Sequence, residues 1–320
     1  MSARHADHRT QKAHVSAPAG VVYALVADTV KWPLYYSPIM HVERQEFDGE
    51  RERLRMWSLV GGELKSWTSW RRLDPVARCV EFRQEVPAPP LHSLNGTVQV
   101  RSEGPQDSDV EVTYGFSLAG DLAADTALVE RIGEGHDLAQ RRALSEVAAL
   151  AERWDQLDEL VLSFEESVRV DGPAELVYDF LYRAADWPAV VPHIARVDLT
   201  EDVPGVQRVT VETVTEDGPE TTEAVRICFP HAGRIVYKTT ATPALLEAHT
   251  GEWSVVPDEH GATVIAQHNV LLNEQTVATL LGENTDPAEA RRHVREVIGR
   301  NSRALLDQAA QHAKSAARTL

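Results

Sequence analysis

Two arginines stand in strand-like runs of the sequence, where a buried cation could do chemistry. Because side chains alternate between the two faces of a strand, Trp67, Ser69 and Arg71 share one face of their run. Thr222 and Arg226 share a face of a second run. A guanidinium held in an apolar site donates hydrogen bonds that stabilise negative charge developing on a carbonyl oxygen. The alternative is a structural ion pair with a buried carboxylate.

A histidine and a tyrosine are the candidates for proton transfer, since arginine keeps its proton in proteins. His268 lies on the apolar face of a strand-like run over residues 263–271, and Tyr114 is its counterpart in the first half of the chain. Histidine titrates near neutral pH and suits acid or base work, although a lone inward histidine is more often a hydrogen-bonded core residue. Asp307 and Glu146 are expected on helices, where they could pair with the arginines or orient His268.

Aromatic side chains are the candidates for the wall of a ligand cavity. Flat apolar walls with a few polar groups hold a folding chain in a compact conformer, but aromatic residues of β proteins are as often plain core. The first half is the richer in such residues. The predicted substrate-binding set is Trp32, Tyr35, Tyr36, Trp57, Trp67, Thr222, Trp253 and Asp307.

The chain repeats itself at an offset of 155 residues, and this repeat must position the two arginines. Over residues 15–39 the offset gives eight identities, among them Trp32-Pro33 on Trp187-Pro188. Each arginine follows its Trp-Pro pair by 39 residues. With 320 residues, the chain is long enough for two domains. We therefore predict two copies of one fold, residues 1–157 and 158–320.

Each copy shows the same order of local signals. An extended segment is followed by a helix that opens at Pro18 or Pro173 and is expected to end at the Trp-Pro pair. Several strand-like runs separated by turn signals come next, and a long amphipathic helix closes the copy. This order resembles the helix-grip fold of START-like proteins. The resemblance implies an α+β fold in which an antiparallel sheet wraps around a long C-terminal helix, with an internal cavity between them.

Composition excludes several classes of protein and partner. A net charge of -17 argues against binding nucleic acid or an anionic membrane surface. Two cysteines exclude a disulfide framework, and no metal-binding or cofactor-binding motif is present, so neither metal nor cofactor is expected. The polar N-terminal segment lacks the apolar stretch of a signal peptide, and no run is long enough to span a bilayer, so the expected location is the cytoplasm.

One basic patch stands out against the acidic background. An acidic partner would have to meet arginines on the last helix, although solvated helix charges are the commoner explanation of such a cluster. These arginines are Arg291, Arg292, Arg295, Arg300 and Arg303.

The run from Trp67 to Arg71 resembles the W-x-S-x-R strand of bacterial type II polyketide aromatase/cyclases, and the tandem arrangement is similar to that of their di-domain members. The second half keeps Arg226 but has Thr222 and Ala224 in place of the Trp and Ser. The resemblance implies two START-like helix-grip domains that act on a poly-β-ketone tethered to an acyl carrier protein, among type II polyketide synthase components. The implied reaction is regiospecific first-ring aldol cyclisation, dehydration, or both.

In that interpretation Arg71 and Arg226 clamp the oxyanion, and Ser69, Tyr35, Tyr114 and His268 assist. The first half is favoured for cyclisation because it matches the motif better. Two alternatives stay open: a non-catalytic carrier or sensor of a hydrophobic ligand, and a tandem in which one half is purely structural. Chain length, prior ketoreduction of the substrate, the division of steps between domains and the oligomeric state are not encoded in these patterns.

Overall fold

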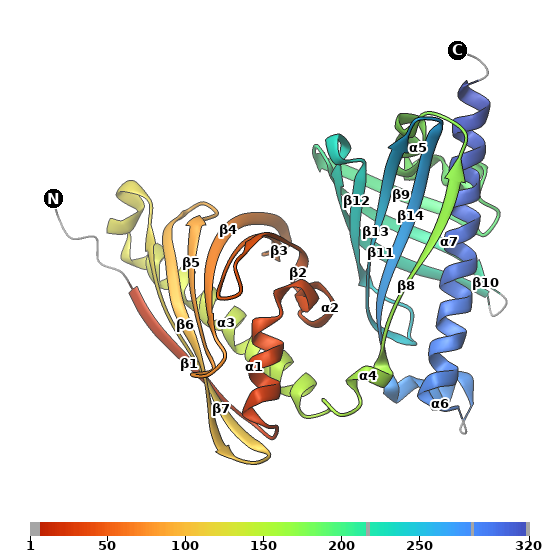
Figure 1. Cartoon of the computed structure of the whole chain (residues 1–320). Helices are drawn as coiled ribbons and strands as arrows, with labels where there is room; N and C mark the ends of the chain where they lie inside the picture. Colours follow the sequence, from red (N-terminus) through yellow and green to blue (C-terminus); the bar gives the residue numbers. More distant parts are fainter. Residues whose placement is uncertain (1–6, 216–217, 283–284, 318–320) are drawn as a thin grey trace. The chain divides into compact units, whose positions relative to one another are not determined.

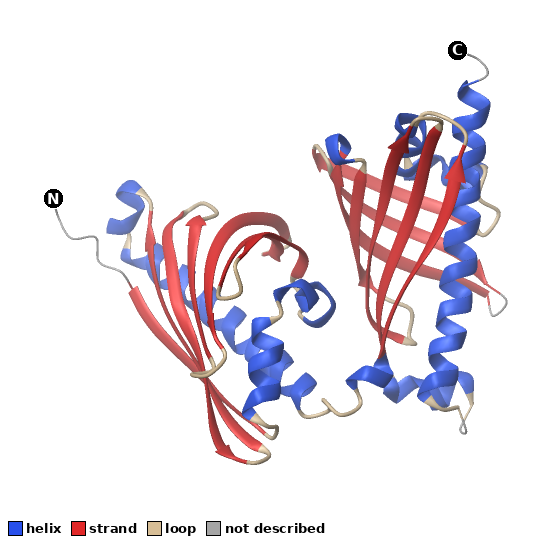
Figure 2. Cartoon of the chain, in the orientation of Figure 1, coloured by secondary structure: helices blue, strands red, loops and turns tan. Residues whose placement is uncertain are grey.

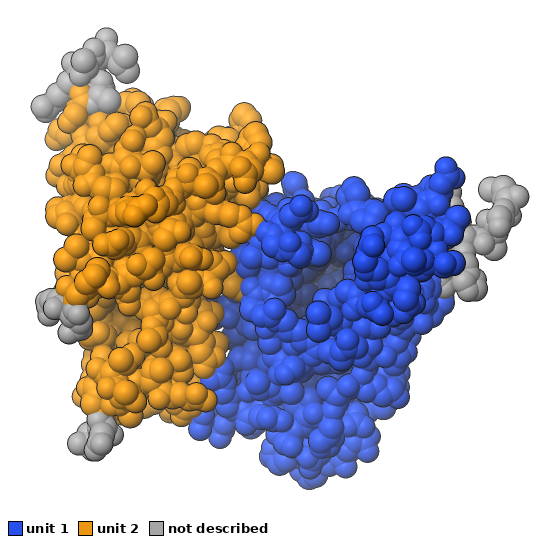
Figure 3. Space-filling view, turned by 180° about the vertical axis from the view of Figure 1, so that it is seen from behind, with its two compact units in different colours: residues 1–157 blue, residues 158–320 orange. Residues whose placement is uncertain are grey.

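A computed structural model describes residues 7–215, 218–282 and 285–317. The chain divides into two compact units, Met1–Leu157 and Asp158–Leu320, shown in different colours in Figure 3. In the described part of the chain, no helix is both long enough and apolar enough to cross a membrane.

The first unit is built on one seven-stranded antiparallel sheet with the order β1-β7-β6-β5-β4-β3-β2 (Figure 1). Its strands are β1 (Asp7–Val15), β2 (Ile39–Phe47), β3 (Arg51–Val60), β4 (Glu63–Asp74), β5 (Cys79–Val86), β6 (Leu91–Gly104) and β7 (Asp107–Leu118). Its helices are α1 (Ala19–Ala27), η1 (Thr29–Lys31), α2 (Trp32–Tyr35), η2 (Gly120–Ala124) and the long α3 (Thr126–Ala151). Helix α3 packs against β1, and α1 packs against α3.

The second unit repeats this topology with the order β8-β14-β13-β12-β11-β10-β9. Its strands are β8 (Val161–Val170), β9 (Ile194–Val203), β10 (Val206–Thr215), β11 (Gly218–Phe229), β12 (Arg234–Ala241), β13 (Leu246–Asp258) and β14 (Gly261–Leu272). Its helices are α4 (Leu157–Leu160), α5 (Ala174–Tyr182), η3 (Ala184–Ala189), η4 (Pro230–Ala232), α6 (Glu274–Leu281) and α7 (Pro287–Ala317). Figure 2 shows the long helix of each unit lying against its curved sheet. The predicted tandem of helix-grip domains is confirmed.

The Trp-Pro pairs lie elsewhere than the sequence predicted. Helix α1 already ends at Ala27, and Trp32 has helical backbone angles at the start of α2. Pro33 occupies the first turn of α2, where its missing N–H costs nothing. Trp187-Pro188 lies inside the short helix η3. The prediction that Trp-Pro ends the first helix was therefore wrong, and other groups must satisfy the last carbonyls of α1 and α5.

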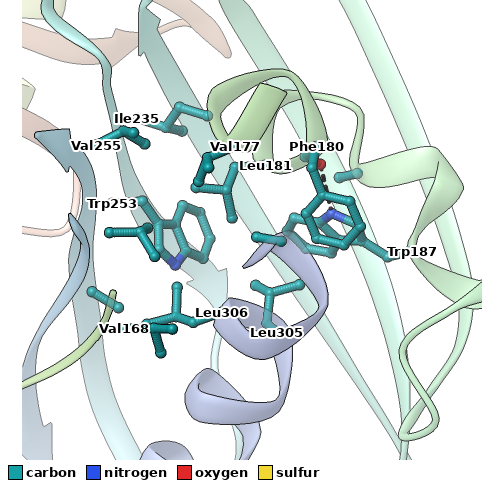
Figure 4. Close-up of a cluster of buried hydrophobic side chains, with 14 of the residues drawn as sticks. Val168, Val177, Phe180, Leu181, Trp187, Ile235, Trp253, Val255, Leu305 and Leu306 are labelled. Atoms are coloured by element: carbon teal, nitrogen blue, oxygen red, sulfur yellow. Dashed lines mark hydrogen bonds between the residues drawn. The ribbon is translucent and has the colours of Figure 1, made fainter. Parts of the chain in front are cut away.

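The core of the second unit lies between the sheet, α5 and α7. Figure 4 shows Leu305 and Leu306 of α7 facing Val177 and Leu181 of α5, with Trp253 of β13 beside them. Leu181 and Leu306 are fully buried. This packing fixes the long helix on the inner face of the sheet, the face that also carries Arg226.

Candidate functional site

In the first domain Arg71 is fully engaged as a structural group. Its side chain is buried, and its Nη2 and Nη1 donate to the carbonyl oxygens of Val26 and Ala27 at 2.8 and 3.2 Å, at the end of α1. Nη1 also pairs with Glu52 Oε1 at 2.8 Å, and Glu52, which has no exposed surface, accepts from Arg44 as well. Arg71 thus caps a helix end whose carbonyls have no partner within the helix, and a carboxylate balances its charge.

Two neighbours complete this cap. Trp32 Nε1 and Tyr36 Oη both donate to the carbonyl oxygen of Leu25, at 3.1 and 3.3 Å. The Arg71 guanidinium lies 5.0 Å from the centre of the Trp32 ring, within the range of a cation–π contact. The recurrence of an arginine 39 residues after Trp-Pro therefore has a structural cause: both residues close the C-terminus of the same short helix.

In the second domain Arg226 closes α5 in the same way but keeps unpaired donors. Nη2 donates to the Leu181 carbonyl, and Trp187 Nε1 donates to the Phe180 carbonyl at 3.1 Å, the dashed line in Figure 4. The Arg226 guanidinium lies 5.3 and 5.5 Å from the ring centres of Trp187 and Trp253. Arg226 is only 2% exposed, yet its Nε and Nη1 have no hydrogen-bond partner. Burial lowers the pKa of both Arg71 and Arg226 to about 10, which leaves them charged at neutral pH.

A single cross-strand neighbour accounts for this difference. Glu52 faces Arg71 across β3 and β4, and Gln207 faces Arg226 at the same register across β10 and β11. The amide of Gln207 is itself committed, since Nε2 donates to Glu201 Oε2 at 2.8 Å and to the Tyr182 carbonyl at 3.3 Å. The second domain therefore lacks, at this register, the carboxylate that neutralises the arginine of the first.

His268 is the centre of a buried polar network in the second domain. Its Nδ1 lies 3.0 Å from Tyr237 Oη and 3.2 Å from His249 Nε2, and its Nε2 lies 3.0 Å from Ser302 Oγ on α7. The ring stacks on Phe164 at 4.9 Å. Burial, and then the neighbouring His249, lower the pKa of His268 to about 3. The imidazole is therefore neutral at physiological pH.

The arginine and the histidine belong to one row of residues that runs across the inner face of each sheet. Strand pairing gives the row of the second domain as Gln207, Arg226, Tyr237, Gly251, His268 and Phe164. The row of the first domain is Glu52, Arg71, Phe82, Gly96, Tyr114 and Arg9. We call these the second row and the first row. The first row thus places Tyr114 where the second places His268.

Glycine is required in the middle of each row. A Cβ atom at Gly251 would stand 2.3 Å from the Tyr237 hydroxyl and 2.6 Å from the Gln267 carbonyl oxygen. At Gly96 it would stand 2.8 Å from Phe82 Cζ. The missing side chain lets the aromatic ring of the neighbouring strand lie across the row, and in the second domain this brings the Tyr237 hydroxyl to His268.

Tyr114 in the first row is tied to charged groups instead. Its hydroxyl donates to Asp137 Oδ1 at 2.7 Å, and Asp137 also pairs with Arg9 at 2.8 Å and accepts from Gln11. Burial and the Asp137 carboxylate raise the pKa of Tyr114 above its ordinary value. The phenol therefore stays protonated as the donor of a structural network between the sheet and α3.

Other predicted site residues of the strands lie either on the same face of the sheet as the arginine or on the opposite face. Ser69 is buried and pairs with Leu54 on the Arg71 face of the sheet, where Trp67 pairs with Met56, and Thr222 shares the Arg226 face of β11. Trp57 lies elsewhere: strand alternation turns it to the face opposite Met56, beside His41 at 5.2 Å between ring centres. Sequence alone did not fix the phase of β3, and the place of Trp57 in the substrate set stays a prediction.

The helix carboxylates do not reach the arginines or His268. Asp307 is half exposed and pairs with Arg303 one turn away at 3.3 Å, and Glu146 accepts from Ser37 at 2.6 Å. Ser302 is the residue of α7 that bonds His268. Tyr35, at the end of α2, is partly buried beside Tyr36.

Sequence reasoning missed Tyr237, His249 and Ser302 as partners of His268, and it missed Glu52 and Gln207 as partners of the arginines. The last two occupy equivalent positions at the 155-residue offset, so the repeat carried a usable signal for them. Among the residues that the structure describes, no cluster of three or more His, Cys, Asp or Glu side chains is arranged to hold a metal ion. Both cysteines are free thiols.

Known proteins resemble this chain over nearly its full length. A family model described as polyketide cyclase/dehydrase and lipid transport matches residues 161–314. The actinorhodin polyketide synthase bifunctional cyclase/dehydratase of Streptomyces coelicolor is 39% identical, over 96% of this chain and 97% of the relative. The di-domain aromatase/cyclase BexL from the BE-7585A biosynthetic pathway superposes with a TM-score of 0.82 at 40% identity, covering 96% of this chain and 98% of BexL. StfQ, a di-domain aromatase/cyclase from the steffimycin pathway, gives 0.81 at 32% identity, covering 97% and 99%.

Proposed function

The chain belongs to the family of polyketide synthase cyclase/dehydratases that includes the di-domain aromatase/cyclases, and from this premise we propose that its second domain carries the ring-forming site. This membership favours an enzyme over a passive carrier of a hydrophobic ligand. The proposed reaction is first-ring aldol cyclisation, with or without dehydration, of a poly-β-ketone tethered to a carrier protein. The carrying observation is Arg226, a buried guanidinium in which two nitrogens, Nε and Nη1, have no hydrogen-bond partner.

Ring formation needs one group to accept a proton from carbon and another to hold negative charge. Removal of an α-proton gives an enolate whose carbon attacks a ketone, so that a C–C bond forms and the ketone oxygen becomes an alkoxide. Arg226 donates hydrogen bonds to the oxygen that gains charge, in a site where burial strengthens them. Neutral His268 accepts the proton from carbon, and geometry gives it a fixed ring orientation through Ser302.

Loss of water then requires a proton donor near the new hydroxyl. Tyr237 is the cross-strand neighbour of Arg226, and its hydroxyl lies 3.0 Å from His268 Nδ1. Burial raises the pKa of Tyr237, so the phenol is protonated at neutral pH. In this proposal the protonated His268 first returns its proton to the alkoxide, which becomes the hydroxyl and leaves His268 neutral. Tyr237 then protonates this hydroxyl as it leaves, His268 takes a second α-proton, and one water departs as the double bond forms. The proton on His268 finally passes to the Tyr237 phenolate across their 3.0 Å contact, which restores both groups.

The arginine exchange tests this assignment. In a polyketide synthase reconstituted with the full-length chain, Arg226→Ala is expected to lower formation of the correctly cyclised product on the order of 10²- to 10³-fold. Arg71→Ala is the matched control: it removes a helix cap and an ion pair, and is expected to cost stability while the folded fraction keeps cyclising. A folded Arg226→Ala protein with the normal product pattern and rate would overturn the proposal.

The carrier protein is proposed to dock on α7. A surface pocket of about 420 Å³ lies between α7 and β8. It is lined by Glu166, Arg292, Arg295, Glu296, Gly299, Arg300 and Arg303. Four predicted patch arginines thus converge on a chain whose net charge is -17, which suits an acidic partner. Phe164 contacts both the Arg295 guanidinium and the His268 ring, each at 4.9 Å, so the pocket lies next to the proposed site.

Charge reversal on α7 tests the docking surface. Arg295→Glu with Arg300→Glu is expected to raise the KM for a carrier-tethered substrate and to leave turnover of a carrier-free thioester analogue unaffected, because only the former uses the surface. Equal KM values for the tethered substrate in the variant and the parent would contradict docking at this pocket.

A further inference from the structure

The second domain concentrates unsatisfied polar atoms around Arg226. In its described part, the buried side-chain N and O atoms without a partner are Tyr178 Oη, Gln207 Oε1, Arg226 Nε and Nη1, and Trp253 Nε1. Gln207 is the cross-strand neighbour of Arg226, and Trp253 lies under its guanidinium. A buried polar group left unpaired costs about 1–3 kcal/mol, so several together indicate that something else completes them.

The first domain shows what this arginine takes as a partner. At the register of Gln207 the first row has Glu52, whose carboxylate oxygen lies 2.8 Å from Arg71 Nη1. Glu52 and Gln207 differ in one terminal group, an anionic oxygen against an amide nitrogen. A carboxylate of the first domain therefore bonds directly to its arginine, whereas in the second domain the nearby carboxylate of Glu201 bonds Gln207 instead.

The ligand must then supply that oxygen. Arg226 and Trp253 leave three nitrogen donors unpaired, and these can only donate. A group with acceptor oxygens and a readily delocalised negative charge satisfies them, and a 1,3-dicarbonyl unit in its enolate form has both. A neutral apolar ligand would leave the donors and the charge of Arg226 unsatisfied.

We propose that Gln207 opens a subsite at Arg226 for the enolate of a 1,3-dicarbonyl unit, and that Glu52 occupies the corresponding place in the first domain. This rests on the proposed function of the second domain and specifies which chemical group of the substrate its arginine binds. Gln207 acts as a positioning residue: it does not touch the reacting atoms but leaves Arg226 free to do so. Arg71 of the first domain has a structural role, because Glu52 of the same domain is its counterion.

The decisive variant is Gln207→Glu in the full-length chain, with acetylacetone as the probe. The parent is expected to bind one equivalent at the second domain and to stabilise the enolate, so that the ultraviolet band of the enolate appears at a lower pH than in free solution. Gln207→Glu is expected to lose this spectral shift and at least ten-fold in binding, because its own carboxylate pairs with Arg226. A folded Gln207→Glu protein that binds and shifts the probe like the parent would overturn the inference.

Two further variants separate charge from structure. Gln207→Leu loses the same bond to Glu201 but adds no anion, so the enolate shift should persist; its loss would mean that the Gln207 amide matters for structure alone. Glu52→Gln should open the first domain and raise the stoichiometry from one equivalent to two, and a folded Glu52→Gln protein that binds one equivalent contradicts the role given to Glu52. If Glu52→Gln fails to fold, Gln207→Glu still decides.

Failure of this inference is distinguishable from failure of the proposed function. An inactive Arg226→Ala protein beside a fully active Gln207→Glu protein keeps the ring-forming site in the second domain and removes only the enolate subsite. A fully active Arg226→Ala protein removes both.

Discussion

The first and second rows have the same strand order and the same charged arginine, yet only the first row pairs that arginine with a carboxylate. In the first row Glu52 neutralises Arg71, and Asp137 with Arg9 ties down Tyr114. In the second row the flanking groups are neutral: Gln207, Tyr237 and His268. The comparison teaches that a buried arginine does not by itself mark a reactive site. What marks it is whether the protein or a ligand must supply the anion.

Removal of the counterion should give the largest difference in stability between the two rows. Glu52→Ala leaves Arg71 charged and unpaired in the interior, so we expect about 3–5 kcal/mol less free energy of unfolding. Gln207→Ala removes hydrogen bonds of an uncharged group and should cost about 1 kcal/mol. Denaturant unfolding of the full-length variants, followed by tryptophan fluorescence, measures both. Equal losses would show that the charge of Arg71 is balanced by groups other than Glu52.

Substitution of the glycine in each row should cost less stability than Glu52→Ala, and the two substitutions should differ in their effect on activity. Gly251→Ala and Gly96→Ala each place a Cβ against a backbone carbonyl and an aromatic ring, with an expected cost of about 1–3 kcal/mol. Gly251→Ala also pushes Tyr237 away from His268, so product formation should fall in that variant. Gly96→Ala displaces Phe82, which has no proton to transfer, and serves as the matched control. Similar activity losses in the two variants would contradict the assignment of Tyr237.

The free energy of unfolding of the second domain should fall gradually in acid, because His268 is buried in its neutral form. Because burial holds the pKa of His268 near 3 in the folded chain, the unfolded chain takes up this proton first as the pH falls below about 6.5. The free energy of unfolding should therefore drop by about 1.4 kcal/mol per pH unit for this one histidine, between about pH 6.5 and the lower folded value. His268→Gln should remove that share of the slope. An unchanged slope in this variant, measured by denaturant titration between pH 4.5 and 6.5, would show that His268 is not buried in its neutral form.

Sequence reasoning found the fold because the repeat is unbroken from Val15 to Gly96 in the first copy and from Val170 to Gly251 in the second. The 155-residue offset carries Glu52 to Gln207 and Arg71 to Arg226, and strand pairing preserves both positions. The sequence analysis also predicted that Tyr114 corresponds to His268, and the strand pairing confirms this correspondence. A family resemblance on the Arg71 strand led to the correct enzyme class.

The details of the site depended on contacts between elements that are distant in sequence. The phase of β3 decided that Trp57 points away from Arg71, and the phase of α7 decided that Ser302, rather than Asp307, meets His268. The sequence analysis favoured the first half as the cyclisation site because that half contains the W-x-S-x-R strand. The neutral residues around Arg226 instead favour the second half, and no motif on its own strand indicates them.

Because each arginine also closes the end of a short helix, neither copy can discard it without loosening its own scaffold. At this site the two copies therefore differ in the residues around the guanidinium and not in the arginine itself. In our proposal, exchange of one carboxylate oxygen for an amide NH2 group on the adjacent strand is enough to turn a structural arginine into one that binds substrate. For anyone redesigning such a tandem, the position beside the arginine is the one to vary, and the arginine itself is the one to keep.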